Sequence, residues 1–241
     1  MSEPGTRGYD FRHMRLDGYR NINELYPQMD RLHCCETLFG DPQAEVLLLA
    51  QDAAHVSRFE SAMAKDPEKN PFRHDPDLPT NARLFGYLGK YFDVGRSTED
   101  PNNRGCNIYY ANAIWLLKEG DGAQAPVKQA GKALEVSLPV LTATVRQLVR
   151  LRIVIALGSV SYRAVRLLDP RLPPWADVRC RGLNPASLLG KQMMVGTTFH
   201  PGGRGRNNRV RHEKSMGGSG SPDVIFERDF DGFFSDEFLR S

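Results

Sequence analysis

Residues 45–55 read Glu-Val-Leu-Leu-Leu-Ala-Gln-Asp-Ala-Ala-His, an apolar run that ends in polar side chains. The run at 46–50 is too short for a helix and apolar on both faces, which is typical of a buried strand in a parallel sheet. A second run of this kind, Ile-Val-Ile-Ala-Leu at 153–157, is followed by Gly158. Strands buried on both faces need helices above and below the sheet, so these runs decide the fold class.

Two further apolar segments, 107–116 and 193–199, are expected to complete the sheet. Helical patterns separate the strands, at residues 80–91, 126–150 and 159–168. Because strands alternate with helices, the sequence predicts an α/β protein, a three-layer α/β/α arrangement with a short central parallel sheet of about four strands. Segments rich in Pro or Gly predict loops at 56–79 and 202–221.

Length and composition are typical of a globular domain. The chain has 241 residues, of which 40% are hydrophobic and 25% charged. It is long enough to bury a core without disulfide or metal support. We expect residues 1–40 to form an N-terminal cap segment and residues 41–241 to form a single α/β/α domain that is monomeric.

No apolar run approaches the ~20 residues of a membrane span, so no membrane partner is expected. The N-terminus lacks an apolar signal core, which favours a cytoplasmic or otherwise intracellular location. Cys34 and Cys35 are adjacent, whereas Cys106 and Cys180 stand alone. This pattern is typical of reduced thiols and has no zinc-site spacing. The sequence therefore predicts no metal and no cofactor.

The net charge is +3, but the charged residues are unevenly distributed along the chain. Residues 204–214 contain five Arg or Lys side chains and one acid, whereas residues 222–241 contain six acids and two bases. The basic segment predicts a polyanion partner. The alternative is a solvated surface loop. Five phenylalanines in the acidic segment predict that it docks as a helix.

Polar side chains follow or end three of the predicted strands. They are Asp52 with His55, Asn112, and His200. In α/β sheets ligands bind beyond the carboxyl ends of the strands. These residues are therefore the candidates for chemistry.

Taken together, these segments resemble the uracil-DNA glycosylase superfamily. Residues 50–55, Ala-Gln-Asp-Ala-Ala-His, resemble its first motif, Gly-Gln-Asp-Pro-Tyr-His, and residues 199–204, Phe-His-Pro-Gly-Gly-Arg, resemble its second, His-Pro-Ser and a DNA-probing loop. Asn112 matches the asparagine that reads the uracil edge. Residues 70–72 and 81–84, Asn-Pro-Phe and Asn-Ala-Arg-Leu, are similar to the Arg-Pro-Phe and Gly-Arg-Leu stretches of thermophilic branches. The resemblance spans roughly residues 45–210.

The resemblance implies a monofunctional DNA glycosylase that hydrolyses the N-glycosidic bond of uracil in DNA and leaves an abasic site for base excision repair. Its partners would be uracil-containing DNA and free uracil as product. Such an enzyme swings the nucleotide out of the stack into a pocket. Water then attacks the sugar carbon through an oxocarbenium-like transition state.

Two residues are the catalytic candidates under this resemblance. Asp52 would position water and stabilise the cationic sugar; the alternative role is a helix N-cap or turn aspartate. His200 would donate to uracil O2 as negative charge develops there; the alternative is a structural histidine at a strand end. Backbone N–H groups of Gln51 and Asp52 would assist.

Asn112 and Phe72 would recognise the base together with Gln51. The Asn112 amide offers an acceptor and a donor side by side, which matches uracil N3–H and O4. Phe72 would stack on the ring. The alternatives are a strand-end asparagine that closes a turn and a core phenylalanine that anchors a long loop.

Four residues are the candidates for DNA contact: His55, Arg204, Arg206 and Arg209. Arg204 would enter the duplex or fill the gap left by the flipped nucleotide, and the other arginines would hold phosphates.

The sequence departs from the family pattern at several positions. Ala54 stands where the best-known branch has the tyrosine that excludes the methyl group of thymine, so the substrate range is left open. The cysteines lack the spacing of the iron–sulfur branches. No lysine is expected where it could form a Schiff base, so water is expected to be the nucleophile.

Three alternative functions remain open. The first is a module that binds uracil or damaged DNA without releasing the base. The second is a glycosylase for other deaminated bases. The third is an unrelated α/β hydrolase or nucleotide-binding protein, but the sequence contains no P-loop, Gly-x-Gly-x-x-Gly fingerprint or nucleophile elbow.

Overall fold

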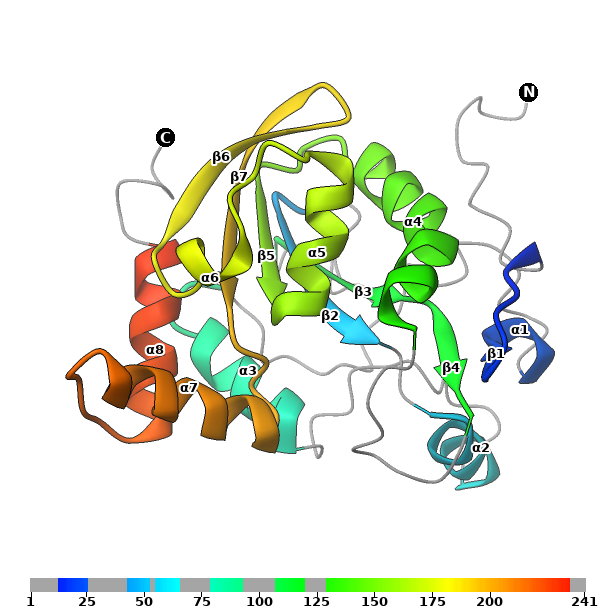
Figure 1. Cartoon of the computed structure of the whole chain (residues 1–241), viewed down its shortest axis with the longest axis horizontal. Helices are drawn as coiled ribbons and strands as arrows, with labels where there is room; N and C mark the ends of the chain where they lie inside the picture. The colour runs from blue at the N-terminus through cyan, green and yellow to red at the C-terminus, as the bar shows by residue number, and fades with distance from the viewer. Residues whose placement is uncertain are drawn as a thin grey trace.

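The computed structural model describes residues 13–25, 43–52, 55–65, 79–92, 107–119 and 129–234. Within them lies a five-stranded sheet in the order β3-β2-β5-β7-β6 (Figure 1). Its strands are β2 (Val46–Asp52), β3 (Ile108–Ile114), β5 (Ile153–Leu157), β6 (Leu183–Leu188) and β7 (Lys191–Thr198). The pairs β3–β2, β2–β5 and β5–β7 are parallel. The predicted parallel α/β sheet is thus confirmed.

The strand at the other edge of the sheet, β6, was not predicted. It runs antiparallel to β7. The hairpin turns at Leu189 and Gly190, which both have positive φ, as the tight turns of β-hairpins require. Because β6 contains Pro185 and polar residues, it lacks the apolar pattern from which a strand is predicted. An edge strand tolerates such residues.

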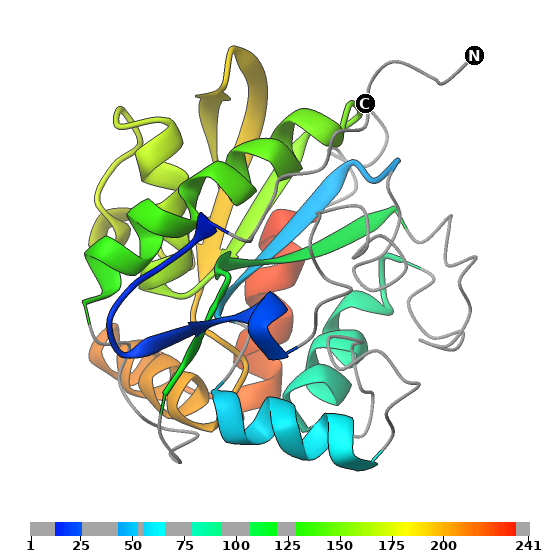
Figure 2. The ribbon, with the colours of Figure 1, turned by 90° about the vertical axis from the view of Figure 1, so that its right-hand side faces the viewer.

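Helices cover both faces of the sheet, which confirms the three-layer prediction. Helices α4 (Ala130–Gln147) and α5 (Ser159–Leu168) pack on one face, against β3 and β5. Helices α3 (Pro79–Leu88) and α8 (Pro222–Phe233) lie together on the opposite side (Figure 2). A side chain at Gly196 of β7 would meet Phe233 and Ile155, so α8 sits directly on the sheet.

The acidic C-terminal segment docks as a helix, as its phenylalanines predict. Phe226 and Phe230 of α8 are fully buried. Both stack on Tyr87 of α3, with ring centroids 5.6 and 5.7 Å apart. Phe238 lies outside the described residues.

Two predicted loops contain helices. Residues 203–215 form α7 (Gly203–Ser215), and residues 56–65 form α2 (Val56–Lys65). Helix α7 lacks an apolar stripe but makes ion pairs to α8. Tertiary contacts, rather than intrinsic propensity, therefore stabilise this helix.

The N-terminal segment joins the fold at residues 13–25. Strand β1 (Tyr19–Asn21) pairs antiparallel with β4 (Leu116–Lys118), and α1 (Ile22–Leu25) follows it. Asn21 is buried and its side-chain amide donates to the Met14 carbonyl. This small sheet caps the end of β3. The short helix α6 (Trp175–Val178) precedes β6.

No helix of the described residues is long and apolar enough to cross a membrane.

Candidate functional site

The strand order reverses direction between β2 and β5. From β2 the chain moves to β3 on one side, and it later returns to β5 on the other side of β2. Such a reversal of strand order is where open α/β sheets bind ligands. Pairing of β2 with β5 stops at Leu49, whereas pairing with β3 continues to Asp52. The β2–β5 ladder therefore ends three residues before the β2–β3 ladder does.

Asp52 ends β2 and is held by two side chains. The Gln51 amide donates to Asp52 Oδ2 at 2.7 Å. The Lys118 ammonium lies 3.2 Å from the same oxygen, and only about a tenth of either side chain of this pair is exposed, 10% and 11%. These two contacts fix the carboxylate in place at the end of the strand.

His200 follows β7 and is held as a neutral donor. The Gly202 N–H donates to His200 Nδ1 at 3.0 Å, so the ring proton resides on Nε2. Burial of the ring lowers the pKa of His200, and the negative charge of Asp52 opposes this shift. The two candidate catalytic groups therefore interact electrostatically, and the imidazole is neutral at pH 7.

Close backbone packing fixes the position of His200. A Cβ atom at Gly205 would lie 1.9 Å from the His200 carbonyl oxygen. Only glycine allows α7 to approach the histidine this closely. Gly158, after β5, has a φ of 102° and donates its N–H to the Thr198 carbonyl at 2.7 Å. The ends of β5 and β7 are therefore held together beneath the histidine.

Asn112 lies on the same face of the sheet as Asp52. It pairs in register with Ala50, two residues before Asp52, and residues two apart on a strand share a face. Asn112 is half-buried, and β3 continues past it to Ile114. It is therefore inside the strand rather than at its end, where it had been expected. Phe72, like Ala54, lies outside the described residues.

The basic segment separates into two faces on α7. Arg209 is 4% exposed and binds Asp229 through two nitrogens, at 2.8 and 2.7 Å, and Glu213 at 2.9 Å. A guanidinium that is buried among carboxylates cannot also reach a phosphate. In this arrangement Arg209 holds α7 to α8, and its predicted DNA contact stays a prediction.

Arg206 faces α8 as well. Its guanidinium binds Asp223, at 3.1 Å for Nη2, and the Tyr87 hydroxyl at 2.9 Å. This ion pair lowers the pKa of Asp223 to about 2. The interaction joins α3, α7 and α8, so Arg206 is a structural residue in this arrangement rather than the phosphate contact that was expected.

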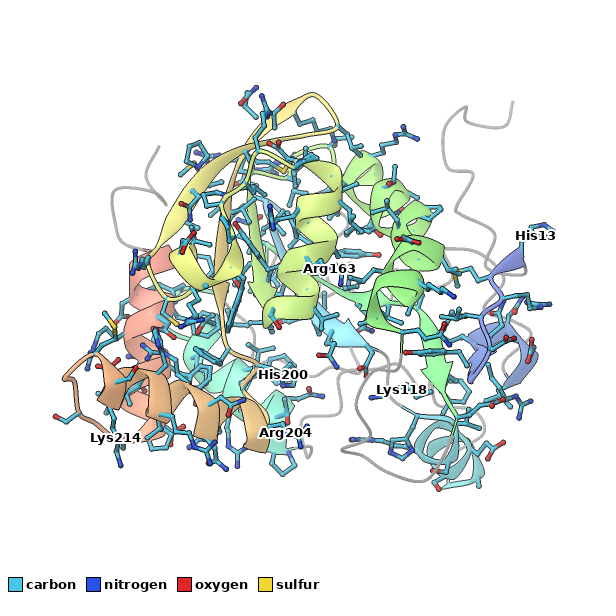
Figure 3. All side chains as sticks on the ribbon, in the orientation of Figure 1. His13, Lys118, Arg163, His200, Arg204 and Lys214 are labelled. Carbon is cyan, nitrogen blue, oxygen red and sulfur yellow. The ribbon has the colours of Figure 1, made fainter. Side chains whose placement is uncertain are left out.

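Arg204 and Arg211 occupy the outer face of α7. Both are exposed, and a separation of seven residues brings them to one side of the helix. Arg204 lies in the first turn, four residues after His200. Figure 3 shows His200, Arg204 and Lys118 along the lower edge of the molecule, where the carboxyl ends of β2 and β7 lie. Arg204 is therefore placed where the site meets solvent.

His55 is buried, with 9% of its surface exposed. Its Nδ1 lies 2.9 Å from the Ser57 hydroxyl, and its backbone forms a bridge with Lys118. His55 therefore contacts Ser57 and Lys118 in this structure, and its expected phosphate contact stays a prediction.

The sequence analysis missed two residues next to Asp52. Lys118 lies 3.2 Å from the Asp52 carboxylate, although the sequence predicted no lysine where it could form a Schiff base. Tyr19 pairs directly opposite Lys118; burial and the charge of Asp52 raise the pKa of Tyr19 to about 12. A lysine at the end of an apolar strand run was a visible signal for Lys118, whereas Tyr19 carries no signal because its partner lies about a hundred residues away, at position 118.

Chemically, the site offers a fixed carboxylate, a neutral N–H donor, a half-buried amide and an amine. No cluster of three metal-ligating side chains occurs in the described part of the chain.

No model of a protein family matches the sequence, and a search of curated proteins finds no significant match.

Proposed function

We propose that the protein is a DNA glycosylase that hydrolyses the N-glycosidic bond of uracil in DNA and leaves an abasic site. The observation that carries this proposal is the electrostatic interaction between Asp52 and a neutral His200 at the carboxyl ends of the strands. The two groups match the two charges of the transition state. A carboxylate stabilises the cationic sugar, and an N–H donor stabilises the departing base anion.

The proposed roles are those that the resemblance to the uracil-DNA glycosylase superfamily implies. Asp52 orients water toward C1′ of the sugar. His200 Nε2–H donates to uracil O2. Asn112, on the same sheet face as Asp52, reads N3–H and O4. A cytosine there would leave buried polar groups unpaired, which costs about 1–3 kcal/mol.

DNA would approach along the outer face of α7. Arg204 supplies a cation next to the site, and Arg211 lies two helical turns further along. These residues support binding of the phosphate backbone. Arg206 and Arg209 contribute indirectly, because they fix α7 to α8.

A second candidate is a module that binds uracil-containing DNA without releasing the base. The ion pair between Asp52 and Lys118 favours it, since the lysine neutralises charge that hydrolysis would use. A glycosylase for other deaminated bases is a variant of the first proposal, because Ala54 replaces a bulky residue of the family pattern.

The test is base release from oligonucleotides that carry one uracil, hypoxanthine or xanthine, single-stranded and double-stranded, followed by alkaline cleavage of abasic sites. Binding to the same oligonucleotides is measured in parallel. Cleavage at uracil is expected. Uracil-dependent binding without cleavage would favour the binding module, and cleavage only at the altered purines would favour the variant.

A further inference from the structure

Lys118 is a buried amine beside the candidate catalytic carboxylate. It ends β4, is 8% exposed, and its Nζ lies 3.2 Å from Asp52 Oδ2. The N-terminal strand holds it there, because Tyr19 pairs opposite Lys118 and the Glu119 N–H donates to the Gly18 carbonyl at 3.1 Å.

A hydrolytic site gains nothing from this cation. Asp52 stabilises positive charge on the sugar only to the extent that its own charge is available, and an ammonium ion beside it opposes that effect. Burying the ammonium also costs solvation free energy. The short distance between the amine and the carboxylate allows another step. The carboxylate can accept a proton from the ammonium as Nζ attacks, and the amine then acts as a nucleophile toward an aldehyde.

We propose that Lys118 gives the protein a second activity, the cleavage of abasic DNA through a Schiff base. The substrate is the product of the proposed function, an abasic sugar whose open-chain form carries an aldehyde at C1′. The inference rests on the proposed function for where that sugar sits, but abasic DNA prepared separately is an equally good substrate.

The chemistry balances without an oxidant, reductant or metal. Asp52 takes a proton from the Lys118 ammonium, and the free electron pair on Nζ forms a bond to C1′. The proton on Asp52 passes to the C1′ oxygen, a second proton moves to that oxygen from Nζ, and the C1′–O bond breaks to release water, which leaves a protonated imine. Asp52, a carboxylate again, removes a proton from C2′. The C3′–O bond then breaks, and the phosphate leaves with the electron pair. Water finally hydrolyses the imine and releases Lys118.

The experiment uses the full-length protein and an oligonucleotide with a preformed abasic site. Sodium cyanoborohydride reduces an imine to a stable amine, so a covalent protein–DNA band appears on a denaturing gel. Wild type is expected to form this band and, without reductant, to cleave the strand without alkali. Lys118→Arg and Lys118→Gln are expected to lose both activities. The arginine variant retains a cation for Asp52, so its loss cannot be ascribed to a broken ion pair.

The matched control is Lys90→Arg. Lys90 follows α3 and forms an exposed ion pair with Glu227 at 3.0 Å, away from the site. The Lys90→Arg variant is expected to form as much covalent protein–DNA adduct as wild type. Peptide mapping of the wild-type adduct is expected to identify Lys118 as the residue linked to DNA. No band with wild type, or an undiminished band with Lys118→Arg, would overturn the proposal.

The outcome is separable from that of the proposed function. Trapping on preformed abasic DNA without uracil release would overturn only the glycosylase, and uracil release without trapping would overturn only the lyase.

Discussion

The proton of His200 is positioned by one backbone hydrogen bond. Because Gly202 N–H occupies Nδ1, only Nε2 can donate to a ligand. Burial adds to this effect by disfavouring the imidazolium form. The site is therefore prepared to stabilise an anion with a neutral donor, and no proton has to be gained first.

We expect His200 to carry its proton on Nε2 and to titrate below the ordinary histidine pKa of 6.5, because its pKa is lowered. Nitrogen-15 NMR of the ring, assigned with His200→Gln, measures both properties. A proton on Nδ1, or a pKa above the ordinary value, would contradict the account.

Protein stability should follow the same titration. The folded-state pKa of His200 is depressed, so below pH ~6.5 the unfolded state binds more protons than the folded state. The stability that neutral His200 contributes is fully present above that pH and is lost as the pH falls through its lowered folded-state pKa. His212, whose pKa is also lowered, acts in the same direction.

At the scale of elements, the packing of α7 against the end of β7 determines where His200 lies. Gly205 is the point of closest approach, since a Cβ atom there would overlap the His200 carbonyl. Helix α8 also holds α7 in place, through the ion pair between Arg209 of α7 and Asp229 of α8. The helix is therefore a support for the histidine as well as a basic surface.

Gly205→Ala is expected to displace His200 and lower the rate of base release by about 100-fold, comparable to the loss of one transition-state donor. The matched control is Gly86→Ala on α3, where an added Cβ meets nothing within 4 Å. Single-turnover rates and thermal unfolding are measured for both. Equal rates in the two variants would show that the close approach does not position the histidine.

The four parallel strands and the layers could be predicted from the sequence, because buried apolar runs report directly on local structure, whereas the polar edge strand β6 could not. Helix α7 could not be, since the contacts that stabilise it, such as Arg209 with Asp229, join positions twenty residues apart. The same limit applies to the site. Asp52 and His200 stand at strand ends that the pattern reveals, whereas Lys118 reaches Asp52 only through the tertiary fold.

At the scale of the whole molecule, the arginines of α7 form two groups, one paired with acids of α8 and the other exposed to solvent. The acids of α8 neutralise Arg206 and Arg209, and Arg204 and Arg211 remain exposed. The acids of α8 therefore both hold α7 in place and neutralise part of its positive charge. Affinity for DNA should depend on the outer cations, and stability on the inner ones.

Arg204→Ala and Arg209→Ala test this division as a pair. Arg204→Ala is expected to weaken DNA binding and reduce the slope of log affinity against log salt by about 1, without a change in stability. Arg209→Ala leaves Asp229 buried and unpaired, so the free energy of unfolding should fall by about 3–5 kcal/mol. Urea unfolding and salt titrations of DNA binding measure the two effects. Lower stability in Arg204→Ala, or weaker DNA binding without a loss of stability in Arg209→Ala, would contradict this division.

The most direct test of the central claim is the single-turnover release of free uracil from an oligonucleotide, compared among wild type, Asp52→Asn and His200→Ala. The account predicts release by wild type, a loss of about 100–1000-fold in His200→Ala, and a loss of orders of magnitude in Asp52→Asn. Absence of release by wild type, or equal rates in all three proteins, would contradict it.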